Sequence, residues 1–151
     1  AKHDLGFYYP SGWRIEERDP KTSSPYPDTT ELSLWLIDTS AETRSETAVI
    51  TISTQSLDVV TAPLENHAHH KGHADDHEGE KSNTKQSLKM KGKKTYKYTF
   101  PQTATVNREM YYIEVGAKTY SIQTFYEVTN TARSSSYMTD FNKIVESMRV
   151  L

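Results

Sequence analysis

Apolar and polar side chains alternate along several short stretches, which is the pattern of half-buried β-strands. The pattern is seen over residues 31–38, 47–56, 88–90, 95–100, 109–115 and 118–128. In 31–38 three leucines share one face while Trp35 and Ile37 occupy the other, so we expect a central strand that is covered on both sides. The β-branched residues of 47–56 suit a strand that pairs with it.

Turn and loop signals separate the strands. Gly116-Ala117 predicts a type II′ turn between the last two strands, because glycine suits the first turn position. A Pro-Ser-Gly sequence predicts a turn that joins two short edge strands at 5–10 and 13–17. Residues 19–30 contain three prolines and several hydroxyl side chains, so we expect a surface loop there.

Residues 131–148 follow a helical spacing instead. The apolar stripe of this segment consists of Tyr137, Phe141, Ile144, Val145 and Met148. Such a stripe predicts a C-terminal helix packed on the sheet. A chain of 151 residues is the usual size of one domain, so we expect a single α+β domain built on an antiparallel β-sheet with flanking helices. Trp13, Trp35 and the tyrosines of the strand-like runs, Tyr8 and Tyr9 included, are expected in its core.

A polar, His-rich insertion interrupts the pattern at about 62–86. Apart from Leu64 it has hardly any apolar side chain, so we expect no core face from it. Five of the six histidines in the chain fall within eleven of its residues. They are His67, His69, His70, His73 and His77, interleaved with Asp75, Asp76 and Glu78. Imidazole next to carboxylates indicates binding of a divalent metal ion or a response to pH.

The spacing of the histidines suits zinc if the segment is helical. In a helix over 62–77, His69, His73 and His77 would lie on one face. A zinc site needs about four ligands, which Asp76, Glu80 or His3 could complete. The candidate metal ligands for zinc or another divalent metal are therefore His67, His69, His70, His73, His77 and Asp76. A solvated insertion without a specific role and a protonation switch stay open as alternatives.

A lysine-rich stretch follows the insertion. Seven lysines occur between Lys81 and Lys97, and the next acidic residue is Glu109. Such a band could dock an acidic partner or lipid headgroups. Lysines on an outer strand also keep a sheet edge soluble and block its pairing with other chains, and we favour this second interpretation.

Composition and motifs exclude several classes of function. A net charge of -2 and a pI near 6.3 give no overall attraction for nucleic acid or an anionic membrane. There is no cysteine, and no apolar run is long enough to span a membrane. The chain begins at Ala1, which suits the trimmed part of an exported precursor. We find no nucleophile elbow, phosphate loop or dinucleotide motif, so no enzyme is expected; a small metal-dependent hydrolase is the distant alternative.

Four short motifs carry a resemblance to a known family. Residues 6–13 read GFYYPSGW, 92–98 read GKKTYKY, 116–122 read GAKTYSI and 141–148 read FNKIVESM. In this order they resemble the PsbP-like family, from the aromatic-x-x-Tyr-Pro-x-Gly-Trp opening to the Phe-x-x-Ile-Val-x-Ser-Phe ending. The resemblance spans almost the whole chain.

The resemblance implies an α/β/α sandwich and an extracytoplasmic protein that works by binding. The best-known members are extrinsic subunits of photosystem II, where they assist calcium and chloride retention; many bacterial relatives look like lipoproteins, and cyanobacterial ones have been associated with zinc. This chain departs from the pattern in its His-rich insertion and in Met148, which replaces the usual phenylalanine. No ligand residue can be transferred from the family.

We therefore expect one PsbP-like domain over residues 1–151 that acts as a non-enzymatic extracytoplasmic binding or accessory domain and binds a divalent metal through its His-rich loop. The alternative is a protein-interaction or accessory lipoprotein domain without a specific metal site. In either case the expected partner is a protein rather than nucleic acid, and contact with a membrane would run through a lipidated N-terminus that this sequence does not include.

Overall fold

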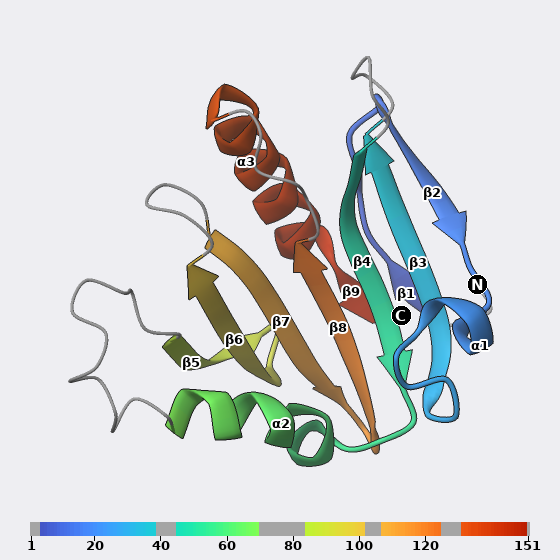
Figure 1. The fold of residues 1–151 in the computed structure, drawn as a ribbon, viewed down its shortest axis with the longest axis vertical. Coiled ribbons are helices and arrows are strands. Elements are labelled where there is room, and N and C mark those ends of the chain that lie inside the picture. The colour runs from blue at the N-terminus through green and yellow to red at the C-terminus, as the bar shows by residue number, and fades with distance from the viewer. Residues whose placement is uncertain (1–3, 39–44, 70–83, 102–106, 125–130, 151) are drawn as a thin grey trace.

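A seven-stranded antiparallel sheet forms the centre of the molecule (Figure 1). The computed structural model describes residues 4–38, 45–69, 84–101, 107–124 and 131–150. In order across the sheet, the strands are β2 (Trp13–Glu17), β3 (Thr30–Asp38), β4 (Ser45–Ser53), β8 (Lys118–Thr124), β7 (Asn107–Val115), β6 (Lys93–Pro101) and β5 (Thr84–Met90). The expected antiparallel sheet is confirmed, and β2 and β5 are its two edge strands.

Three helices and a small two-stranded ribbon complete the described part of the chain. The helices are α1 (Pro20–Ser23), α2 (Leu57–His69) and α3 (Thr131–Ser147), and the ribbon pairs β1 (Leu5–Gly6) with β9 (Arg149–Val150). None of the helices in the described ranges is long and apolar enough to cross a membrane.

The larger hydrophobic core lies between α3 and one face of the sheet. It contains Leu32 and Leu36 of β3, Ile50 and Ile52 of β4, Ile113 of β7 and Ile122 of β8. From the helix come Phe141, Ile144 and Val145, with Met148 directly after it, which confirms four of the five positions of the predicted stripe. The fifth, the side chain of Tyr137, is outside the described part of the structure.

A smaller core lies on the opposite face of the sheet, against α2. It contains Leu57, Tyr98, Met110 and Tyr112, with Val60 and Leu64 packed beside them. Alternation along β6 and β7 sends Tyr98 and Met110 to this face, while Thr95 and Ile113 face α3.

The helix α2 corrects the predicted extent of the polar insertion. Leu57, Val60, Thr61 and Leu64 repeat at helical spacing, and Leu57 and Thr61 are buried. The segment expected to be a polar insertion from about residue 62 therefore begins inside a packed helix. At its other end, residues 84–86 belong to β5 rather than to a loop.

The predicted N-terminal hairpin is wrong. The turn forms, since the backbone N–H of Trp13 donates to the carbonyl of Pro10 at 3.0 Å. However, β2 pairs with β3, and β1 pairs with β9 at the other end of the chain. Tyr8 and Tyr9, which follow β1, are therefore exposed rather than in the core, whereas Trp13 is buried as expected.

Two further predictions have clear outcomes. The β7–β8 hairpin is confirmed, with Val115 paired to Lys118 and φ +61 at Gly116, as a type II′ turn requires of its first residue. The expected extension of the last strand to residue 128 lies beyond the described residues.

The predicted loop at 19–30 contains α1, because Asp19 caps the N–H of Lys21 and Pro20 suits a first helical turn.

Candidate functional site

The predicted metal ligands fall at the end of α2 and beyond it. His67 and His69 belong to the last turn of the helix. His70, His73, His77 and Asp76 lie outside the described residues. Within the described ranges no group of three or more histidines and carboxylates is close enough to hold a metal ion. The metal site therefore stays a prediction.

The helix α2 runs toward the β5 edge of the sheet, so its last turn, which contains His67 and His69, lies there (Figure 1). Its first turns are held by buried Leu57 and by Thr61, whose hydroxyl donates to the Leu57 carbonyl at 2.8 Å. The hydroxyl of Tyr96 in β6 lies 3.4 Å from an Asp58 carboxylate oxygen, which joins the helix start to the sheet. The start of the His-rich segment and the lysine-rich strands thus lie at one end of the molecule.

The lysine-rich stretch forms the hairpin of β5 and β6. We call its five solvent-facing cations the lysine edge: Lys85, Lys89, Lys91, Lys93 and Lys94. The register places Lys85, Lys89 and Lys94 on the α2 face, whereas Lys93 points to the α3 face. Lys89 and Lys94 are direct cross-strand partners, and two like charges in that position are destabilising.

Two of these lysines are held in place by one aromatic ring. The ammonium groups of Lys85 and Lys94 lie 4.0 and 5.3 Å from the centre of the Tyr96 ring. A hydrogen bond to Tyr96, with further attraction from Tyr96 and Asp58, raises the pKa of Lys94. These contacts favour positions of the Lys85 and Lys94 ammonium groups over the Tyr96 ring.

Lys97 has a different environment and is not part of the lysine edge. Its ammonium group lies 3.5 Å from a Glu109 carboxylate oxygen and 5.3 Å from the centre of the Tyr111 ring. Burial opposes its charge, but the hydrogen bond to Tyr111 and the attraction of Glu109 outweigh burial, so the pKa of Lys97 is raised.

The turn of the hairpin is strained at a lysine. Lys91 has φ +50 and Gly92 has φ +81, so both central residues adopt the left-handed region that a type I′ turn requires. Glycine takes that conformation without cost, whereas lysine does not. An asparagine would suit the turn better than Lys91, which makes the charge at this position noteworthy.

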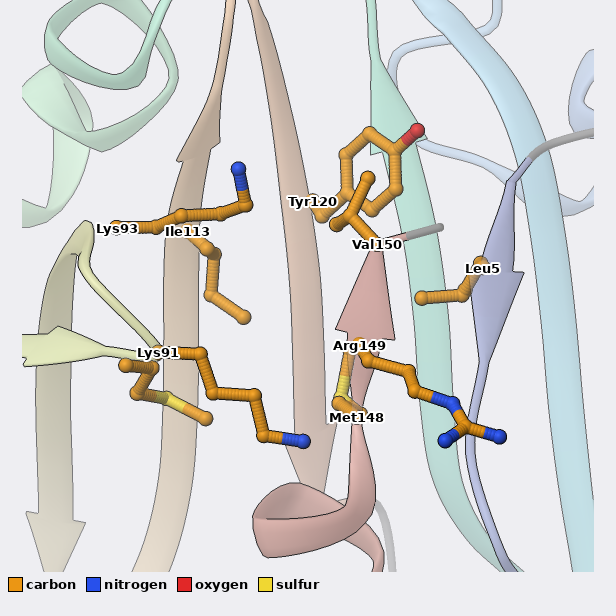
Figure 2. Close-up of a pocket in the computed structure, with 9 residues that line it drawn as sticks. Leu5, Lys91, Lys93, Ile113, Tyr120, Met148, Arg149 and Val150 are labelled. Carbon is orange, nitrogen blue, oxygen red and sulfur yellow. The ribbon is translucent and has the colours of Figure 1, made fainter.

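A pocket lies between this turn and the β1–β9 ribbon, on the α3 face (Figure 2). It has a volume of about 100 Å³. Its apolar lining consists of Leu5, Met90, Ile113, Tyr120, Met148 and Val150. Lys91, Lys93 and Arg149 are the remaining lining residues, so every charge in the lining is positive. Figure 2 shows the Lys91 side chain extending from the turn toward Met148, with Arg149 on the opposite side of the pocket.

The ribbon fixes the position of Arg149. Gly6 pairs with Arg149, and a Cβ atom at Gly6 would lie 3.3 Å from the Nε of that arginine. The absence of a side chain at Gly6 therefore lets Arg149 lie across β1. Nearby, the backbone N–H of Tyr8 donates to the Ser147 hydroxyl at 2.8 Å, which ties the N-terminal segment to the end of α3.

Sequence reasoning recognised the lysines but missed the pocket. The pocket depends on pairing between the first and last strands of the structure, each only two residues long. Strands of that length carry no periodic signal. The one available hint was Val150 after the predicted helix, because an apolar residue there needs a partner.

Comparisons with known proteins bear on the fold. No family model matches the chain, and neither does any curated protein. The solution structure of cyanobacterial PsbP (CyanoP) from Synechocystis sp. PCC 6803 matches with a TM-score of 0.59 and 17% identity, over 99% of this chain and 88% of that one. A crystal structure from Bacteroides thetaiotaomicron VPI-5482 matches with a TM-score of 0.44 and 10% identity, over 98% of this chain and 45% of that one. The chain has a PsbP-like fold, as its sequence motifs predicted.

Proposed function

We propose that this chain is a non-catalytic accessory domain that acts outside the cytoplasm by binding another protein. The observation that carries the proposal is the PsbP-like fold, which extends over 99% of the chain. The family that the sequence motifs resemble works by binding in extracytoplasmic compartments. We also infer the three-layer α/β/α arrangement of that family, because α2 and α3 contribute to hydrophobic clusters on opposite faces of the sheet.

The lysine edge supports a protein-binding role. Sequence alone favoured a solubilising role for these lysines, but such a role does not explain two features of the hairpin. Lys89 faces Lys94 across the strands, and Lys91 occupies a backbone conformation that disfavours lysine. Both features cost stability. An acidic partner would neutralise the repulsion between Lys89 and Lys94, and its attraction to Lys91 would compensate for the backbone strain at that residue.

Native co-purification from the source cell envelope tests this proposal. The variant Lys89→Gln, Lys93→Gln, Lys94→Gln removes three charges from the lysine edge, and the control Arg14→Gln, Lys21→Gln, Lys143→Gln removes three exposed charges elsewhere. We expect wild type and control to retain one partner at a constant ratio, and the lysine-edge variant to lose it. Equal retention by all three proteins, or the absence of any partner from the wild type, would overturn the proposal.

A second candidate function is divalent-metal binding by the His-rich segment. What favours it is the density of imidazole between His67 and His77, a stretch that begins in the last turn of a helix anchored to the sheet. We propose zinc as the ion, held by about four ligands drawn from His67, His69, His70, His73, His77 and Asp76.

Calorimetric titration of the metal-stripped protein with zinc tests the metal site. One variant replaces all five histidines of the segment by alanine, and a matched variant, Asp75→Asn, Asp76→Asn, Glu78→Gln, keeps them. Saturable binding at micromolar concentration should be lost with the histidines and weakened without the carboxylates. Equal binding by wild type and the five-histidine variant would refute the metal site.

A further inference from the structure

The pocket on the α3 face meets the lysine edge at the turn of the β5–β6 hairpin. Lys91 and Lys93 belong to both, because they lie in and beside the turn of the hairpin that also borders the pocket. Arg149 supplies a third cation from the ribbon on the other side (Figure 2). Within the described ranges, no ion pair joins any of the three to a carboxylate. Three cations therefore surround an apolar floor.

The size of the pocket limits what can occupy it. Sites for small organic ligands usually measure about 300 to 1,000 Å³. A volume of about 100 Å³ is well below that range. It suits one apolar side chain, the kind of anchor that a protein partner inserts at the centre of an interface.

The charges around the pocket indicate which groups of the partner should flank the inserted side chain. Carboxylates on both sides of the inserted side chain would face Lys91 and Lys93 on one side and Arg149 on the other. The remaining lysines of the edge, Lys85, Lys89 and Lys94, lie on the α2 face of β5 and β6, where a small molecule in the pocket would not reach them. Both features favour a polypeptide over a free carboxylic acid.

We propose that this pocket binds an acidic segment of a protein partner that inserts one leucine-sized apolar side chain between flanking carboxylates. The inference rests on the proposed accessory function and specifies the partner's chemistry. The floor of Ile113 and Tyr120 receives the apolar group, and the three cations set the position of the acidic residues around it. Long-range attraction by the lysine edge accelerates the encounter.

Fluorescence anisotropy with a labelled synthetic peptide tests the proposal. The probe has one central leucine flanked on both sides by glutamate and aspartate, and a second probe carries serine in place of leucine. The pocket variant Lys91→Asn, Lys93→Gln, Arg149→Gln is compared with the control Lys85→Gln, Lys89→Gln, Lys94→Gln. The control removes the same charge from the same end of the molecule but leaves the pocket intact.

We expect the pocket variant to bind the leucine peptide about tenfold more weakly than wild type and the control variant to lose roughly threefold or less, since contacts at a desolvated pocket outweigh exposed ones. Replacing leucine by serine should cost wild type about tenfold. A third variant, Val150→Phe, fills the pocket without changing charge and should abolish the preference for leucine. Thermal melting of each variant verifies that it is folded.

Three results would overturn the inference: equal losses in the two charge variants, equal binding of the two peptides, or binding to vesicles of anionic phospholipid that exceeds binding to the leucine peptide. These outcomes are separable from failure of the accessory function. If a native partner depends on the lysine edge but the peptide results fail, the accessory function stands and the pocket is not its anchor. If no partner co-purifies with the wild type, the accessory function itself is wrong.

Discussion

At the scale of single residues, Lys91 carries a charge at the expense of backbone strain. Its φ of +50 lies in the left-handed region, which costs a side chain such as lysine about 1 to 2 kcal/mol. Asparagine tolerates that region better. Lys91→Asn should therefore raise the free energy of unfolding by about 0.5 to 1 kcal/mol in urea denaturation.

The neighbouring change Lys89→Asn is the control, because residue 89 lies in regular strand β5 and gains nothing from asparagine. Lys91→Asn is expected to stabilise the protein while it weakens binding of the acidic peptide. A loss of stability in Lys91→Asn would contradict the account of the turn.

Two buried tyrosines make stability depend on alkaline pH. Burial raises the pKa of Tyr112 strongly and that of Tyr111 to a lesser extent. Near pH 10 the unfolded tyrosines ionise while the folded ones keep their protons, so the unfolded state binds fewer protons and stability falls as pH rises. The fall begins near the unfolded pKa and reaches at most about 1.4 kcal/mol per pH unit for each tyrosine, and it ends sooner for Tyr111, because its pKa is raised less.

Tyr112→Phe removes one of these two ionisable hydroxyls. The free energy of unfolding of this variant should therefore fall less steeply above pH 10 than that of wild type. Denaturation at a series of pH values measures the slope, with Tyr8→Phe, whose side chain is 72% exposed, as the matched control. A wild-type slope in Tyr112→Phe would contradict the assigned burial of this hydroxyl.

At the scale of elements, α3 is attached to the sheet through its apolar stripe. Ile144 is fully buried, whereas the adjacent Lys143 is exposed. Ile144→Ala leaves a cavity and should lower the free energy of unfolding by about 2 to 5 kcal/mol. Lys143→Ala should change it by no more than about 0.5 kcal/mol. Similar values for the two variants in urea denaturation would contradict the packing of α3.

The elements differ in how far sequence could predict them. The stripe of α3 and the β7–β8 hairpin were predictable because a long periodic run and a Gly at the turn are strong local signals. In α2, by contrast, the described side chains that pack on the sheet are Leu57, Val60, Thr61 and Leu64, and Pro63 and the polar residues after it conceal their helical spacing. The β1–β9 ribbon joins the two ends of the described chain, and no local pattern encodes a pairing of that range.

At the scale of the whole molecule, the topology brings together groups that are far apart in sequence. The hairpin turn at Lys91 and the ribbon residue Arg149 border one pocket. They do so because β9, which follows α3, lies on the α3 face of the sheet beside that turn. Sequence reasoning therefore recognised the lysines as a linear band but could not assign them to a pocket. It also described the histidines as a cluster, which remains a prediction.

Binding of a partner to this surface should also depend on the salt concentration. Exposed charges attract over about 10 Å at 0.1 M salt and over much shorter distances at 1 M. A partner held mainly by the lysine edge should dissociate as salt rises, whereas an apolar anchor in the pocket should slow that dissociation.

The most direct test of the central claim is photo-crosslinking in the source cells from the two edges of the sheet. A photoreactive residue replaces Ser87 on β5 or, as control, Glu17 on β2, both of which are exposed. We predict one discrete protein adduct from position 87, none from position 17, and loss of the adduct at high salt. Equal adducts from both positions, or none from position 87, would contradict an accessory domain that docks through its lysine edge.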